Sequence, residues 1–161
     1  MQHSAMMAWF SLTLAFSGTF LGLVEQSLGD TNDVLEPIVL AVGFTPNPTQ
    51  RSGVSGGEVA AETIVGTAQT PTGPCNGFIS EQPDHILTLN TFFEELEIQI
   101  SSQRDTTLIV QGVGGTWCSD DAANHNPRLS GQWQAGTYNV WVGSYRQGAY
   151  YPYQLAIRQP N

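Results

Sequence analysis

Apolar and polar residues alternate along two segments of the chain, Glu95–Ser101 (ELEIQIS) and Tyr153–Arg158 (YQLAIR). Successive side chains of a β-strand point to opposite faces, so each segment predicts a strand with one buried and one solvated face. Such alternation is typical of antiparallel sheets that are packed on one side only.

Shorter runs of β-branched, aromatic and other apolar residues predict further strands. These runs are Gly53–Val65, Ile86–Leu89, Thr107–Gln111 and Tyr138–Val142. Turn-forming residues separate them, as in the expected loop Thr67–Pro74, and no window keeps a helical period for more than about two turns. Strands at intervals of roughly ten residues predict an all-β sandwich.

The N-terminal part of the chain differs in composition from the rest. Met6–Val24 is an uncharged apolar stretch, and the small residues Ser27 and Gly29 follow it. This order is typical of a secretory signal peptide, expected at residues 1–29, with an uncleaved membrane anchor as the alternative. Asp30–Ser52 holds three prolines and is expected to be a linker, in which Ile38–Val42 forms an extra strand or a clip onto the sandwich. The folded domain is then expected to cover residues 53–161.

The order of DTTLIVQG, GGTWCSDD, NP and SGQWQAGTYNVWVGSY between residues 105 and 145 resembles the bacterial pre-peptidase C-terminal domain, in a variant of secreted and periplasmic proteins. The likeness extends through PCNGFISEQPDHILTLN and YPYQLAIRQ, so it covers roughly Gly53–Gln159. The resemblance implies a jelly-roll-like antiparallel β-sandwich of about seven to nine strands. It also implies an accessory module of an exported protein that has no catalytic residues and is not an enzyme.

The charge balance narrows the class of partners. The 161 residues carry a net charge of −9, with five arginines, no lysine and 14 acidic residues. Nucleic acids and anionic membranes are bound by clustered positive charge, so this composition disfavours both as partners. It fits a soluble acidic protein or a protein that binds cations.

Cys75 and Cys118 are the two cysteines of the chain. Neither belongs to a C-x-x-C motif, and no second pair completes a zinc site. In an exported chain, two cysteines of one small domain are expected to form a disulfide, and two separately buried thiols are the alternative. The disulfide in turn predicts an oxidising compartment, so that the protein is secreted or periplasmic.

A loop of aspartates and asparagines offers the one plausible set of metal ligands. Calcium prefers carboxylate, amide and carbonyl oxygens on a flexible loop. The candidate ligands are Asp120, Asp121, Asn124 and Asn126. The loop lacks the regular spacing and the glutamate of an EF-hand, so Asx-turns that satisfy loop amides are the alternative.

Aromatic residues crowd the last third of the chain. Tyr138 and Trp141 are expected on opposite faces of one strand, so that at least one of them fills the core. Rings beyond those needed in the core would suit stacking on sugars or gripping an extended peptide. The residues that carry this prediction of a ligand-binding surface are Tyr145, Tyr150, Tyr151 and Tyr153.

One motif has the sequence pattern of a catalytic serine. Gly53–Gly57 (GVSGG) matches the G-x-S-x-G pattern of serine nucleophiles. That pattern requires a strand before it, a helix after it, and a histidine and a carboxylate placed by the fold. A glycine-rich turn is therefore expected here, and not a nucleophile at Ser55.

The sequence thus predicts a non-enzymatic exported accessory domain that binds a peptide or a glycan of the cell envelope or extracellular space. The expected partner is another envelope or extracellular protein, or a glycan, with no membrane contact after removal of the signal. A structural or assembly subunit of a larger complex is the alternative, and a small serine hydrolase is the third hypothesis. No cofactor is expected other than calcium at the acidic loop.

Overall fold

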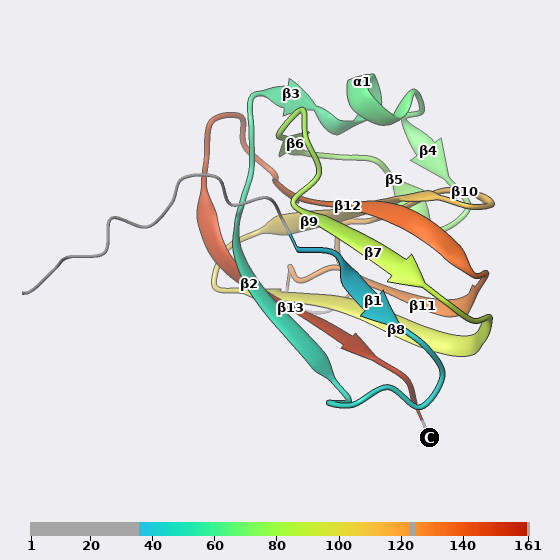
Figure 1. Ribbon diagram of the computed structural model, residues 1–161. Coiled ribbons are helices and arrows are strands. Elements are labelled where there is room, and N and C mark those ends of the chain that lie inside the picture. Colours follow the sequence, from blue (N-terminus) through green and yellow to red (C-terminus); the bar gives the residue numbers. More distant parts are fainter. Residues whose placement is uncertain (1–35, 123–124, 161) are drawn as a thin grey trace, which may run out of the picture. The chain divides into compact units, whose positions relative to one another are not determined.

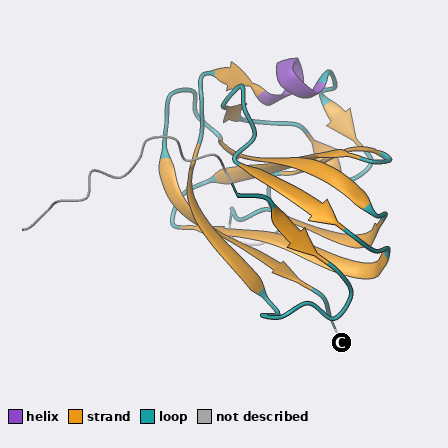
Figure 2. Ribbon diagram, viewed as in Figure 1, coloured by secondary structure: helices purple, strands orange, loops and turns teal. Residues whose placement is uncertain are grey.

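The computed structural model describes residues 36–122 and 125–160. The expected signal peptide, residues 1–29, lies outside the described residues. Two main β-sheets pack face to face as the two layers of a sandwich (Figures 1 and 2). The predicted all-β sandwich is therefore confirmed. Within the described part of the chain, no helix is both long and apolar enough to cross a lipid bilayer.

The larger sheet is organised around one central strand, β12. Its strands are β1 (Ile38–Leu40), β3 (Val59–Ala60), β6 (Phe78–Ile79), β7 (His85–Leu89), β9 (Thr106–Gly112), β10 (Gly115–Ser119) and β12 (Gly136–Ser144). β12 pairs antiparallel with β9, and also with β7 and β6. β10 extends the sheet beyond β9, and β1 adds to β7 in parallel.

The smaller sheet has the order β11-β8-β13-β2, with antiparallel pairs throughout. Its strands are β2 (Thr49–Ser55), β8 (Phe93–Ser102), β11 (Arg128–Trp133) and β13 (Tyr151–Arg158). The alternation predicted for β8 and β13 is confirmed, because their apolar residues are buried between the sheets. On the outer face of β8, the Glu97 carboxylate forms ion pairs with Arg128 of β11 and Arg158 of β13.

The core between the sheets includes a group of three aromatic rings. The ring centroids of Trp117 and Trp133 are 5.2 Å apart, and those of Trp133 and Tyr138 are 5.3 Å apart. Tyr138 is 1% exposed and donates its hydroxyl to the Gln134 carbonyl oxygen, so its polar atom is satisfied. These rings pack in the core, so the tyrosines after β12 are the remaining candidates for the predicted ligand-binding surface.

A second, smaller core covers the other face of β12. It contains Trp141, helix α1 (Ala61–Val65) and the disulfide between Cys75 and Cys118, which confirms the predicted bond. The disulfide ties Cys75, which follows the hairpin of β4 (Gln69–Thr70) and β5 (Gly73–Pro74), to β10. Figure 1 shows α1 and β4 on one side of the larger sheet, away from the smaller one. Tyr138 and Trp141 thus lie on opposite faces of β12, as expected.

The N-terminal expectations need three corrections. Within the expected linker, residues 30–52, Ile38–Leu40 forms the extra strand expected at Ile38–Val42, but residues 49–52 are not linker because they belong to β2, which pairs with β13. Gly53–Val65 is not one strand, because Ala61–Val65 turns into a helix that ends at Gly66 in the left-handed conformation (φ 75°). Thr67–Pro74 is not a plain loop, because it contains the β4–β5 hairpin.

Candidate functional site

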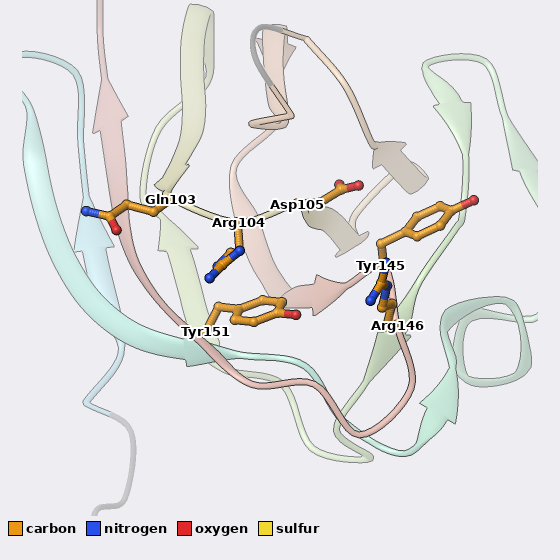
Figure 3. A pocket seen from close by; sticks show the side chains of 6 residues that line it. All are labelled: Gln103, Arg104, Asp105, Tyr145, Arg146 and Tyr151. Carbon is orange, nitrogen blue, oxygen red and sulfur yellow. The ribbon is translucent and has the colours of Figure 1, made fainter.

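The candidate site is a cavity between two connections that cross from one sheet to the other. The turn of residues 103–105 leads from β8 to β9, and the loop of residues 145–150 leads from β12 to β13. Both connections lie at the same end of the sandwich, since Ser102 pairs with Tyr153 and Ser144 pairs with Thr106. The cavity has a volume of about 420 Å³ (Figure 3). Its lining residues are Gln103, Arg104, Asp105, Tyr145, Arg146 and Tyr151.

Two of the four predicted tyrosines line this cavity. Tyr145 is 56% exposed at the start of the loop, and Tyr151 is the first residue of β13. Tyr150 is exposed outside the cavity, where its hydroxyl donates to Glu58 Oε1 at 3.2 Å. The structure corrects the placement of Tyr153, which is 4% exposed and shares a hydrogen bond of 2.7 Å with His85 Nε2. Tyr153 is therefore a core residue and not part of a surface.

Two arginines line the same cavity, and sequence reasoning did not identify them as a pair. The side chains of Arg128 and Arg158 bind Glu97, and Arg51 donates to the Gln50 carbonyl oxygen. Among the described residues, the guanidinium groups of Arg104 and Arg146 have no such partner. In Figure 3, Arg104 extends from the turn in the direction of Tyr151, while Arg146 lies next to Tyr145. The rarity of basic residues in this chain is the signal that could have drawn attention to each arginine.

Asp105 belongs both to the cavity and to a cluster of possible metal ligands. One ligand atom each of Asp105, Asp121 and His125 lies within 4.8 Å of the others. Burial and the negative charges of Asp120 and Asp121 raise the pKa of Asp105, and His125 opposes this shift. Among the described residues, Asp105 Oδ1 and Asp120 Oδ1 are buried and lack a hydrogen-bond partner. These oxygens are therefore available to a cation or to a hydrogen-bond donor.

The ligand set predicted from the acidic loop is only partly brought together. Asp121 faces His125, with 3.5 Å between Asp121 Oδ1 and His125 Nδ1, whereas Asp120 Oδ2 accepts a hydrogen bond from Asn76 Nδ2 at 2.9 Å. Asn126 Oδ1 accepts a hydrogen bond from the amide of Ser102, so this oxygen fixes the loop to β8. Asn124 lies outside the described residues. Sequence reasoning missed Asp105 and His125 because the first is distant in sequence and the second offers nitrogen.

Ser55 does not have the surroundings of a nucleophile. Its side chain is 0% exposed, and its Oγ is hydrogen-bonded to Ser144 Oγ at 2.9 Å. His85, the buried histidine, bonds to Tyr153 instead. The G-x-S-x-G pattern serves packing, because a Cβ at Gly53 would overlap with the Tyr153 ring and one at Gly57 with the Ile79 backbone.

No known protein-family profile matches the chain. An uncharacterized protein of Synechococcus elongatus is 34% identical to it over 112 residues, which make up 67% of this chain and 73% of that protein. The chain belongs to the family of this protein. Because this relative is uncharacterized, the family contributes no activity, and the function has to be argued from the site.

Two solved structures are similar to this member of the family. One is the pre-peptidase C-terminal domain of collagenase from Bacillus anthracis, with a TM-score of 0.44 and 11% identity, covering 77% of this chain and 96% of that chain. The other is a periplasmic inhibitor of g-type lysozyme from Aeromonas hydrophila, with a TM-score of 0.40 and 14% identity, covering 75% of this chain and 95% of that chain. The first is the domain type that the sequence resembles.

Proposed function

We propose that this chain is a non-enzymatic exported binding domain whose ligand occupies the cavity between the β8–β9 turn and the β12–β13 loop. The observation that carries the proposal is the convergence of Tyr145, Tyr151, Arg104 and Arg146 on one cavity. Small-ligand sites are concave and combine ring or apolar surface with a few polar groups that fix orientation. The disulfide supports export, because such bonds persist in oxidising compartments.

The rigid frame around the cavity supports binding. Both connections are short and are held by paired strands at each end, so their backbones need little ordering when a ligand arrives. Loops on a rigid β-scaffold commonly carry recognition residues. A peptide or a glycan of the envelope or extracellular space is the proposed ligand, and an assembly role in a larger complex is the competing function.

Replacement of Tyr151 by Ala is expected to weaken ligand binding by about two- to tenfold, because aromatic contacts contribute on the order of 0.5–1.5 kcal/mol. The full chain is tested on a glycan array and against immobilised envelope proteins, and the best ligand is then titrated. Tyr150→Ala is the matched control, since Tyr150 is an exposed ring outside the cavity. Capture of an envelope protein that both variants retain would favour the assembly role.

A divalent cation at Asp105, Asp121 and His125 is a second proposal, supported by one buried oxygen each of Asp105 and Asp120 that has no hydrogen-bond partner in the described part of the chain. Carboxylate oxygens suit calcium, while the imidazole of His125 suits zinc and related metals better. A bound cation would also favour the ionised form of Asp105 and so oppose the rise of its pKa.

Calcium at a hundredfold excess over its dissociation constant is expected to raise the free energy of unfolding by about 2.7 kcal/mol. Asp121→Asn should remove most of this gain, since it deletes one charge from the cluster and keeps the shape. Thermal melts with calcium, magnesium, zinc and a chelator measure the effect, and Glu81→Gln is a control for the loss of an exposed charge elsewhere. Melting curves indifferent to every metal would leave the loop as a set of Asx-turns.

A further inference from the structure

The cavity concentrates positive charge in a protein that has little of it. The chain carries five arginines, no lysine and 14 acidic residues, yet Arg104 and Arg146 both line this cavity. Both side chains are exposed, and no other side chain among the described residues neutralises them. A guanidinium group presents a planar fork of donors that matches a carboxylate. The pair therefore favours a ligand with a carboxylate group.

The same cavity also contains a neutral polar group, which a simple anion would not use. The Gln103 amide offers both an acceptor and a donor of hydrogen bonds. Sugar hydroxyls donate and accept as well, so they would satisfy both atoms of this amide. A ligand that meets both the arginines and Gln103 needs acid groups and hydroxyls together.

The tyrosines add ring surface at the two sides of the cavity. Tyr151 lies near Arg104 in Figure 3, and the ring of Tyr145 extends outward at the other side. Aromatic rings bind the apolar faces of sugars while their hydroxyls remain free for hydrogen bonds. The volume of about 420 Å³ falls within the range of small-ligand sites, roughly 300–1,000 Å³.

We propose that the ligand of this cavity is an acidic oligosaccharide, with one uronate carboxylate bound by Arg104, a second bound by Arg146, and sugar hydroxyls bonding to the Gln103 amide. This inference rests on the proposed function, because it names the ligand class of the same cavity. A peptide that ends in a carboxylate would engage an arginine as well, but it offers fewer hydroxyl groups to Gln103.

The test is a calorimetric titration of the full chain with short oligomers of galacturonic, glucuronic and mannuronic acid. Each oligomer is compared with its methyl ester, which keeps the sugar framework and removes the charge. At least one free acid is expected to bind about tenfold more tightly than its ester or more, because hydrogen bonds between charged groups are the strong ones. Arg104→Gln and Arg146→Gln should each lower the affinity for the acid about tenfold and leave the affinity for the ester unchanged.

Arg51→Gln is the matched control, since it removes the same charge from an exposed arginine outside the cavity. Melting curves of all three variants check the fold. Equal binding of acid and ester would overturn the acidic class while leaving the proposed binding function intact. Arginine-dependent binding of an oligoglutamate peptide without binding of any uronate would overturn the saccharide class. Absence of binding to every probe would overturn this inference, and the array experiment would then decide the proposed function separately.

Discussion

Reduction of the Cys75–Cys118 disulfide is expected to lower the free energy of unfolding by about 4 kcal/mol, according to the chain-entropy estimate for a loop of this length. The two cysteines are 43 residues apart, so the bond restricts a large part of the unfolded chain. For a domain of this size the melting midpoint should fall by roughly 10 °C or more.

The loss should be global and not confined to the β4–β5 hairpin. Hydrogen bonds hold the hairpin to β10 independently of the disulfide. Thr72 Oγ1 donates to the Cys118 carbonyl oxygen at 2.9 Å, and the Cys118 amide donates to Thr70 Oγ1 at 3.2 Å. The folded state therefore keeps most of its contacts after reduction, while the unfolded state gains conformational entropy.

Denaturant unfolding with and without reductant measures this effect, and alkylation of the thiols verifies that reduction is complete. The Cys75→Ala/Cys118→Ala double variant serves as the control, because its stability should not respond to reductant. An unchanged midpoint in the fully reduced wild-type protein would show that the bond contributes little to stability.

The strands that the sequence predicts best are those whose signal is local. β8 and β13 each bury one face, so alternation alone marks which residues enter the core. The run from Tyr138 to Val142 is predicted as a strand for its β-branched and aromatic content, and its lack of strict alternation follows from burial on both faces of β12.

The elements that the sequence misses or leaves open depend on partners that are distant along the chain. The run Ile38–Val42 predicts an extra strand or a clip, and only the parallel partner β7 shows that Ile38–Leu40 is a strand of the larger sheet. The helical segment Ala61–Val65 spans little more than one turn, so it carries no periodicity, and it is held by packing in the second core.

The cavity could be predicted only in part, for a similar reason. Tyr145 and Tyr151 stand out because they exceed what the core needs, and they do line the cavity. Arg104 and Asp105 come from a turn about forty residues earlier, and the pairing of β9 with β12 and of β8 with β13 brings that turn beside the β12–β13 loop. Tyr153 is a tyrosine like Tyr150 and Tyr151, but the alternation of side chains along β13 places its ring in the core.

Asp84→Asn is expected to stabilise the protein at neutral pH by up to about 4 kcal/mol, because each pKa unit corresponds to about 1.4 kcal/mol. Burial raises the pKa of the Asp84 carboxyl from 3.8 to about 7, although hydrogen bonds oppose the shift. One of these is donated by the Val142 amide to Asp84 Oδ2 at 2.7 Å. An asparagine keeps an oxygen acceptor for this amide and removes the cost of burying a charge.

The neighbouring residue has the opposite dependence on pH. Burial, with a contribution from Arg51, lowers the pKa of His85 from 6.5 to about 4, and the neutral ring bonds to the Tyr153 hydroxyl. Between pH 4 and 6.5 the unfolded chain binds more protons at His85 than the folded chain does, so the free energy of unfolding rises with pH. Between pH 4 and 7 the folded chain binds more protons at Asp84, so its contribution falls with pH.

The contributions of Asp84 and His85 therefore offset each other in the wild-type protein, and single variants should separate them. Denaturant unfolding at several values between pH 4.5 and 7.5 gives the difference between each variant and the wild type. The advantage of Asp84→Asn should grow as the pH rises, from nearly nothing near pH 4 to its maximum above pH 7. The difference for His85→Gln should change in the other direction, by up to about 3 kcal/mol between pH 4 and 6.5. Differences that do not vary with pH would contradict the shifted pKa values of Asp84 and His85, because only a difference in protonation between the folded and the unfolded chain produces the opposed slopes.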